Sequence, residues 1–366
     1  MARTILVFSN SVSGLFTFRR EVMSAIADAG YKVLLIGPED DVTIHSYPDI
    51  GCQTLLIDFS SRGMNPFAEL RLLKKYCKFI KQYRPVAVLT YTIKPNIYGG
   101  MACRMLKVPQ IANITGLGDA MENKGWLRSM TILLYRVALG KVHKVFFQNS
   151  YNREFFRKNG IVRDNSGVIP GSGVNLQYHR FQAYPQDGDI RFIFMGRLIH
   201  DKGAKEYLDA AETVGHKYPG VQFWILGMYE DAYKDRIERL ILAGILRFIP
   251  STTDVRPVLK ETHCTVLPSY HEGMSNVNLE SAANGRPVIT TNVPGCRETV
   301  DDGITGFLAE AKDSGSLIEA IERFIQLPYG QKVKMGENAR KKVEKEFDRQ
   351  IVVNTYLKEI QSISHV

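Results

Sequence analysis

The stretch IRFIFMGRLIHDKGAKEYLDAA, residues 190–211, decides the fold class. It opens with an apolar run typical of a buried strand, continues through a short loop with two glycines, and ends in an amphipathic helical pattern. The same order of strand, loop and helix recurs along most of the chain. Because this alternation is typical of parallel strands joined by crossover helices, the sequence predicts an α/β protein with doubly wound sheets.

The apolar runs form two series. The first has expected strands at residues 4–8, 32–36, 53–57, 86–90, 110–114 and 144–148. The second follows a loop-like stretch and has expected strands at residues 190–195, 221–226, 246–249, 264–267 and 287–291. A chain of 366 residues is long enough for two domains. We therefore expect domains at 1–175 and 176–347, with a last helix at about 348–366 that packs back on the first domain.

The composition indicates which cellular compartment and which kinds of partner to expect. The first apolar stretch is about five residues long, too short for a signal peptide, and no segment offers the roughly 18 uninterrupted apolar residues of a membrane span. Five scattered cysteines without CxxC spacing argue against a disulfide framework or a zinc site, so the cytosol is the expected compartment. Residues 1–170 hold 23 Lys and Arg against 12 Asp and Glu, which makes the first half strongly basic. The two halves are expected to face different partners.

The loop inside residues 190–211 carries the first candidate site. Arg197 and Lys202 stand between the end of a strand and the start of a helix, and Gly196 and Gly203 let the backbone bend closely. Two cations beside a helix N-terminus form an anion site, and a diphosphate suits it because arginine binds oxygens bidentately while lysine supplies a point charge. An ordinary solvated loop is the alternative.

The stretch HEGMSNVNLE, residues 271–280, carries the second candidate site. A helix that starts near Met274 puts Glu272 just before its N-terminus and Glu280 about six residues on, roughly 9 Å along the axis. Amides at the helix start would then point at an anion, and the Glu280 carboxylate could accept from both hydroxyls of a vicinal diol. The alternative makes Glu280 an ordinary surface residue. The candidate donor-binding residues of this stretch are Glu272, Gly273, Met274, Ser275, Asn276 and Glu280.

Three motifs in this order resemble the C-terminal domain of the retaining glycosyltransferases of family four: GRLIHDKG (196–203), PSYHEGMSNVNLE (268–280) and NGRPVITTNVPGCRETVDDGITGFL (284–308). The resemblance implies the GT-B fold, two doubly wound Rossmann-like domains that face a central cleft. It implies that Arg197 and Lys202 hold the nucleotide diphosphate, and that Glu272 lies at the donor sugar while Glu280 binds the ribose. Glu272, Arg197 and Lys202 are the expected catalytic residues.

The N-terminal half resembles the branch of that family that builds bacterial surface and lipid-linked glycans, through SVSGLFTFRREV (11–22), TYTIKPNIYGGMACRMLKVPQIANITGLG (90–118) and FFQNS (146–150). The resemblance implies a polyprenyl-diphosphate acceptor. Its expected acceptor and phosphate residues are Gly14, Arg19, Lys94, Thr115, Gly116 and Gly118.

Two features depart from the family pattern. Many members have a histidine that contacts the donor sugar after the strand matching 110–114, where this chain has the residues GLGD at 116–119. The first loop has the single glycine Gly14 where others often have two, and a simple turn is an equal reading of it.

The basic half contains a candidate membrane anchor. Residues 124–144 hold five Lys or Arg and no acid, together with Trp126, Leu127, Arg128 and Met130. A basic helix with an aromatic residue is a plausible anchor on an anionic leaflet, and packing in the core is the alternative. Nucleic acid is not expected as a partner, because no recognition motif supports it. A dinucleotide-dependent oxidoreductase is rejected, because GLGDAM lacks the third glycine of GxGxxG.

These observations predict a retaining glycosyltransferase, peripheral on the inner leaflet of the cytoplasmic membrane. It would move a sugar, a HexNAc or related hexose, from a UDP-sugar to a polyprenyl-diphosphate-linked saccharide in bacterial glycan assembly. No cofactor or metal is expected, because protein cations and helix amides would stabilise the departing diphosphate. The alternatives are a GT-B nucleotide-sugar epimerase and a non-enzymatic nucleotide-sugar-binding protein.

Overall fold

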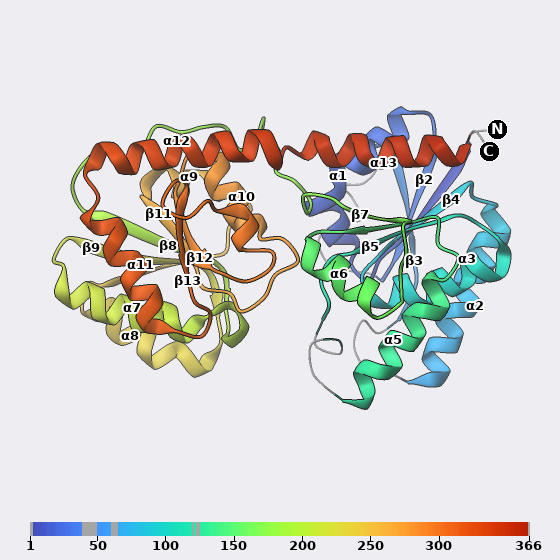
Figure 1. The fold of residues 1–366 in the computed structure, drawn as a ribbon, viewed down its shortest axis with the longest axis horizontal. Coiled ribbons are helices and arrows are strands. Elements are labelled where there is room, and N and C mark those ends of the chain that lie inside the picture. Colours follow the sequence, from blue (N-terminus) through green and yellow to red (C-terminus); the bar gives the residue numbers. More distant parts are fainter. Residues whose placement is uncertain (1–2, 39–49, 60–64, 119–120, 122–124, 365–366) are drawn as a thin grey trace. The chain divides into compact units, whose positions relative to one another are not determined.

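The computed structural model describes residues 3–38, 50–59, 65–118, 121 and 125–364 (Figure 1). The chain divides into two compact units, Met1–Ser172 with Gln350–Val366, and Gly173–Arg349. Each unit is a parallel sheet with helices on both faces. The predicted α/β class, with two doubly wound sheets, is therefore confirmed.

The first unit has a seven-stranded sheet in the order β3-β2-β1-β4-β5-β6-β7. Its strands are β1 (Thr4–Phe8), β2 (Lys32–Gly37), β3 (Cys52–Leu56), β4 (Ala87–Tyr91), β5 (Gln110–Ile114), β6 (Lys144–Phe147) and β7 (Ser166–Val168). Its helices are α1 (Val12–Asp28), α2 (Pro66–Tyr83), a π-helix (Pro95–Gly99), α3 (Gly100–Leu106), α5 (Trp126–Leu139), α6 (Ser150–Lys158) and α13 (Arg349–Ser364).

The second unit has a six-stranded sheet in the order β10-β9-β8-β11-β12-β13. Its strands are β8 (Ile190–Leu198), β9 (Val221–Tyr229), β10 (Leu246–Pro250), β11 (Cys264–Leu267), β12 (Val288–Thr291) and β13 (Gly306–Ala309). Its longer helices are α7 (Ala204–Lys217), α8 (Lys234–Leu242), α9 (Arg256–Glu261), α10 (Asn276–Ala283), α11 (Ser314–Gln326) and α12 (Tyr329–Glu346).

Strands β7 and β13 are the two that the sequence did not predict. Each is at the edge of its sheet, is three or four residues long and contains a glycine, so its apolar pattern is weak. Every other strand begins and ends within three residues of its expected bounds.

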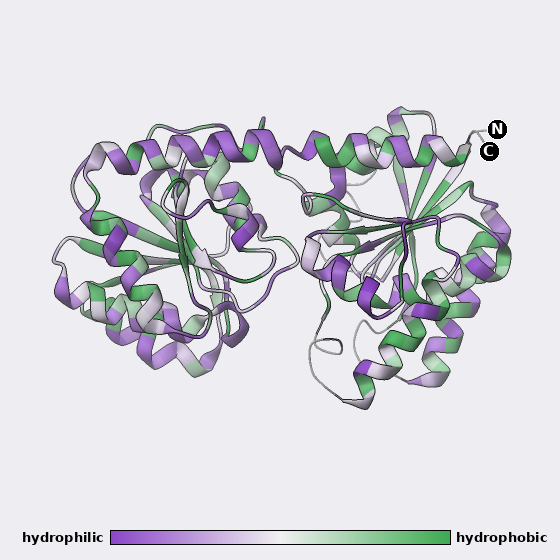
Figure 2. Ribbon diagram, in the orientation of Figure 1, coloured by the Kyte–Doolittle hydropathy of each residue, from purple (hydrophilic) through white to green (hydrophobic). Residues whose placement is uncertain are grey.

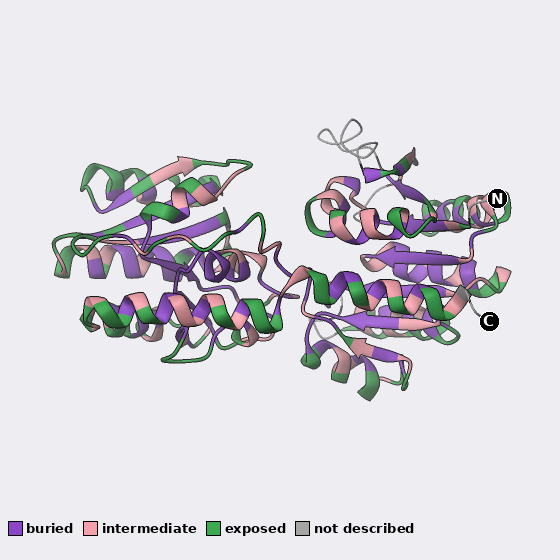
Figure 3. Cartoon of the chain, turned by 90° about the horizontal axis from the view of Figure 1, so that it is seen from above, coloured by how far each residue is buried: buried purple, intermediate pink, exposed green. Residues whose placement is uncertain are grey.

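The hydrophobic cores lie between each sheet and the helices that cover its two faces. Strands β1 and β2 are buried from their second residue on because helices cover both faces of the sheet, which explains the apolar runs at residues 5–8 and 33–36 (Figures 2 and 3). Helix α13 buries Val352, Val353, Tyr356 and Ile360 in the core of the first unit. The Asn113 Nδ2 group donates to the Tyr356 hydroxyl at 2.5 Å, so the last helix is bonded to β5 as well as packed there.

Candidate functional site

The end of β8 carries Arg197. Gly196 has φ +124°, and a Cβ on its β9 partner Gly227 would lie 2.0 Å from the Gly196 carbonyl oxygen, so this pair of positions in β8 and β9 requires glycine. Arg197 is exposed, and its guanidinium makes no hydrogen bond or ion pair within the described part of the chain. It is therefore available to an anion from solution.

Lys202 and Glu272 form an ion pair between the two loops that the sequence singled out. Lys202 ends a short 3-10 helix (His200–Lys202), and Gly203 follows with φ +73°. A Cβ on Gly203 would lie 2.2 Å from the Pro268 carbonyl oxygen, so the two loops are packed backbone to backbone. Glu272 also accepts a hydrogen bond from the Ser269 hydroxyl at 3.0 Å. A carboxylate and an ammonium group thus stand together at the carboxyl edge of the sheet.

Helix α10 begins at Asn276, two residues later than the expected start at Met274. The Ser275 side chain caps it by accepting from the Asn278 amide, and the Ser275 amide donates to the Gly295 carbonyl at 2.8 Å. Because Ser275 is the cap, its own amide is used outside the helix. The expectation that this amide points at an anion is therefore corrected.

Glu280 lies on α10, four residues after its first residue, or about 6 Å along the axis. Burial raises the pKa of Glu280 to about 7, and the Arg349 guanidinium opposes that shift. The Glu280 carboxylate makes no hydrogen bond or ion pair with another described residue. Asn276 lies one turn earlier on the same face, and its buried Oδ1 also lacks a donor. Two acceptors one turn apart on α10 thus have no donor from the described protein, and the Asn276 oxygen is also buried, which suits a ligand that brings hydroxyl groups.

In the first unit, Gly14 lies in the first turn of α1, and its amide donates to the Ser11 hydroxyl at 2.9 Å. Arg19 is buried on the same helix, and its Nη1 donates to the Gly171 carbonyl at 3.0 Å. Lys94 is largely buried and forms an ion pair of 2.6 Å with Glu69. The structure therefore gives both expected phosphate-binding cations partners within the protein.

The loop after β5 is only partly described. Thr115 and Gly116 are partly exposed, and a Cβ on Gly116 would meet nothing within 4 Å. Gly118 has φ +72°, and a Cβ there would lie 2.8 Å from Ile93 Cδ1. Asp119, which stands in the region where many family members have a histidine, lies outside the described residues.

The predicted membrane segment forms helix α5. Trp126 is 74% exposed at its first position, while Leu127 and Arg128 are partly exposed. The Arg128 guanidinium lies 5.0 Å from the centre of the Phe155 ring. The opposite face of α5 packs in the core through Thr131, Tyr135, Ala138 and Leu139. Among the described residues, no helix has the length and apolar character needed to cross a bilayer.

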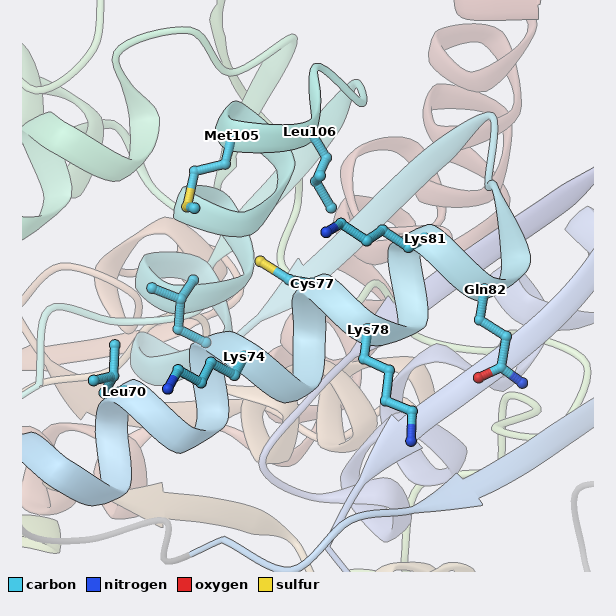
Figure 4. Close-up of a pocket in the computed structure, with 9 residues that line it drawn as sticks. Leu70, Lys74, Cys77, Lys78, Lys81, Gln82, Met105 and Leu106 are labelled. Atoms are coloured by element: carbon cyan, nitrogen blue, oxygen red, sulfur yellow. The ribbon is translucent and has the colours of Figure 1, made fainter.

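A groove between α2 and α3 was not predicted (Figure 4). It has a volume of about 760 Å³. Cys77 faces Met105 and Leu106 across it, and Lys81 extends from α2 toward Leu106. It is lined by Leu70, Leu73, Lys74, Cys77, Lys78, Lys81, Gln82, Met105 and Leu106. Residues 70–84 alternate leucines with lysines, a pattern that by itself is typical of a solvated helix packed on a sheet, and only the neighbouring α3 completes a groove.

Two further residues beside the predicted site were also missed. The Tyr270 hydroxyl donates to the Glu206 carboxylate, with distances of 2.8 and 3.0 Å to its two oxygens. Glu206 is the third residue of α7, where the sequence reads as an ordinary acidic first turn. Glu206 is only 4% exposed, and this burial, which sets it apart from an ordinary surface residue, cannot be predicted from the sequence.

A metal site was not predicted, and metal independence stays a prediction. Within the residues that the structure describes, no three His, Cys, Asp or Glu side chains are grouped to hold an ion. The Asp-x-Asp sequence Asp187–Asp189 precedes β8, so it lies at the amino ends of the strands, opposite to the edge with Lys202.

Two doubly wound parallel sheets in one chain define the GT-B class. The HepE protein of Anabaena, solved in complex with UDP and glucose, has this fold and is similar with a TM-score of 0.79 and 17% identity, covering 99% of this chain and 100% of that one. Two family models match in sequence: Glycosyl transferases group 1 over residues 177–342, and Glycosyl transferase 4-like over residues 5–149. The chain belongs to the family-four glycosyltransferases of GT-B fold.

Two curated relatives are similar over most of their length. The N,N'-diacetylbacillosaminyl-diphospho-undecaprenol alpha-1,3-N-acetylgalactosaminyltransferase of Campylobacter jejuni is 24% identical over 368 residues, 96% of each chain. The UDP-Gal:alpha-D-GlcNAc-diphosphoundecaprenol alpha-1,3-galactosyltransferase of Escherichia coli is 25% identical over 304 residues, 76% of each chain.

Proposed function

We propose that this glycosyltransferase moves a sugar from a UDP-sugar to a saccharide linked to a polyprenyl diphosphate, with retention of anomeric configuration, in bacterial glycan assembly. Both relatives are named for acceptors on diphospho-undecaprenol, and one is named for a UDP-sugar donor. Retention is proposed from the resemblance to the retaining enzymes of family four. The transferred sugar is proposed to be a HexNAc or a related hexose.

The observation that carries the donor assignment is the pair of unsatisfied acceptors on α10. Glu280 and Asn276 offer acceptor oxygens one turn apart, and neither is paired within the described protein. A ribose supplies two adjacent hydroxyl donors, and binding it would give a donor to the Glu280 carboxylate and to the buried Asn276 oxygen, which now costs free energy. The Lys202–Glu272 pair in the preceding loops then suits the diphosphate and the sugar of the same donor.

Arg197, Lys202 and Glu272 have different roles in sugar transfer. Charge develops on the diphosphate as the sugar departs, and Arg197 and Lys202 stabilise it as preorganised cations. Glu272 holds the donor sugar and stabilises the positive charge that develops on it. In the free protein the Lys202–Glu272 ion pair keeps both groups oriented before the donor arrives. With cations in this role the reaction needs no metal ion.

Docking on the inner leaflet is the second part of the proposal. Helices α2, α3 and α5 contain one acidic residue, Glu69, which is buried against Lys94. Their exposed side chains combine lysines of the groove with large apolar residues, including Trp126 and Met105. Basic groups attract anionic headgroups while apolar side chains enter the boundary of the bilayer. This surface would bring the enzyme to an acceptor that stays in the membrane.

Product mass spectrometry tests the proposal. A panel of UDP-sugars is incubated with the protein and a polyprenyl-diphosphate-linked saccharide, and the lipid product is expected to gain the mass of one sugar. Release of an epimerised nucleotide sugar without a change in the lipid would favour the epimerase. Donor binding with no chemical change to either substrate would favour a non-enzymatic binding protein.

A further inference from the structure

We propose that Glu206 and Tyr270 form a positioning clamp, a hydrogen-bonded pair that holds Lys202 and Glu272 in the relative position that sugar transfer requires. The inference rests on the proposed function for its catalytic consequence. It assigns a role to two residues that touch neither donor nor acceptor in that proposal.

Tyr270 is held at four points. Its amide donates to the Asp201 carbonyl at 2.9 Å, and its hydroxyl donates to the Glu206 carboxylate at 2.8 Å. The His200 ring meets the Tyr270 ring edge-on, with centroids 5.1 Å apart. The Lys312 ammonium group lies 5.0 Å from the centre of the same ring. This tyrosine, two residues before Glu272, is therefore fixed to the loop that ends in Lys202.

The burial of Glu206 distinguishes the clamp from an ordinary acidic first turn. An acid in the first turn of α7 is favourable while it stays in water, because the helix N-terminus attracts it. Glu206 is instead 4% exposed, and among the described residues its carboxylate has only the Tyr270 hydroxyl as a hydrogen-bond partner. A buried carboxylate is costly without partners, whereas a hydrogen bond to an ionised acceptor is strong and directional. The arrangement stabilises one position of Tyr270.

The clamp joins the two elements that carry the catalytic pair. Glu206 comes four residues after Lys202, at the start of the helix that Lys202 precedes. Tyr270 precedes Glu272 in the loop after β11. Loss of the clamp therefore displaces Glu272 relative to Lys202 and leaves Arg197 in place. We expect the loss to appear in kcat, while donor affinity changes little.

Tyr270→Phe tests this expectation because it removes only the hydroxyl. We expect kcat to fall about tenfold, since displacing a catalytic group by a fraction of an ångström is costly, with the donor KM changed less than about twofold. In a Glu272→Gln background the same change should cost nothing further, because the clamp acts through Glu272. Glu206→Gln keeps an acceptor for the hydroxyl and should reduce kcat less than Tyr270→Phe does.

Tyr207→Phe is the matched control. It removes a tyrosine hydroxyl that donates to the Trp224 carbonyl at 2.7 Å in the core of the same unit. It should lower the melting temperature and leave kcat unchanged. Equal losses from Tyr270→Phe in the wild-type and Glu272→Gln backgrounds, or a rise in KM alone, would overturn the clamp.

Hydrogen exchange separates the clamp from the proposed function. Tyr270→Phe should speed amide exchange in residues 268–275, while Tyr207→Phe should not. If the wild type transfers no sugar, the proposed function fails, and this readout still decides the clamp. Unchanged exchange in residues 268–275 would refute it.

Discussion

Replacing Glu280 with glutamine is expected to stabilise the protein at pH 8 and to weaken donor binding. The pKa of the Glu280 carboxyl is raised from 4.5 to about 7 by burial. The folded state therefore holds the proton more tightly than the unfolded state, and folding stability falls as pH rises from about 4.5 to about 7. At pH 8 the shift corresponds to a destabilisation of up to about 3 kcal/mol. Glutamine is neutral at every pH and avoids that cost.

The assay is thermal unfolding of the wild type and Glu280→Gln at pH 5 and pH 8. For a unit of this size, the melting temperature of the variant should exceed that of the wild type by about 5 to 10 °C more at pH 8 than at pH 5. Glu319→Gln is the matched control, because Glu319 is an exposed helix glutamate of the same unit without a partner among the described residues. It should show no such pH dependence.

Donor affinity of the wild type should rise with pH, in contrast to its folding stability. Ribose hydroxyls donate to the ionised Glu280 carboxylate, so the wild type should bind the donor more weakly as pH falls below about 7, by up to about tenfold per pH unit. Glu280→Gln should bind the donor weakly at all of these pH values, as measured by calorimetry. An equal melting-temperature difference at pH 5 and pH 8, or a donor affinity of the variant equal to that of the wild type, would show the reasoning to be wrong.

Two further predictions concern the charged groups. Lys202→Ala should lose at least about a hundredfold in kcat/KM with the fold intact, because it removes a cation that stabilises the charge developing on the diphosphate. Lys205→Ala, the control, removes an exposed cation paired with Asp209 and should change activity little. Equal activities of the two variants would count against the diphosphate assignment. Trp126→Ser should weaken flotation of the protein with anionic vesicles, whereas Leu242→Ser, at an 88% exposed apolar position of the second unit, should not. If the two variants float equally well, α5 is not the anchor.

The sequence predicts most of the fold because buried parallel strands leave continuous apolar runs, as in β1 and β2. It misses β7 and β13, whose few residues and glycines leave almost no pattern. It also places the start of α10 at Met274 instead of Asn276, although the Ser275 cap, whose side chain accepts from the Asn278 amide, is a local signal that the sequence does contain.

The site shows the same division between local and distant information. Local spacing singles out Lys202 and Glu272, but their ion pair depends on two loops about 70 residues apart in sequence. The pKa of the Glu280 carboxyl likewise depends on the burial of this group in the fold and on the charge of Arg349, which is 69 residues away in sequence. Tyr270, the partner of Glu206, is similarly distant in sequence, which is why Glu206 reads as an ordinary acidic residue in the first turn of a helix.

Mass spectrometry of the lipid product from the wild type and Glu272→Gln, at equal donor occupancy, tests the central claim most directly. The wild type should add one sugar from a UDP-sugar to the polyprenyl-diphosphate-linked saccharide. Glu272→Gln should bind the donor within severalfold of the wild type and transfer it at least about a hundredfold more slowly. Transfer by Glu272→Gln at the wild-type rate, or no lipid product from the wild type with any UDP-sugar of the panel, would contradict the account.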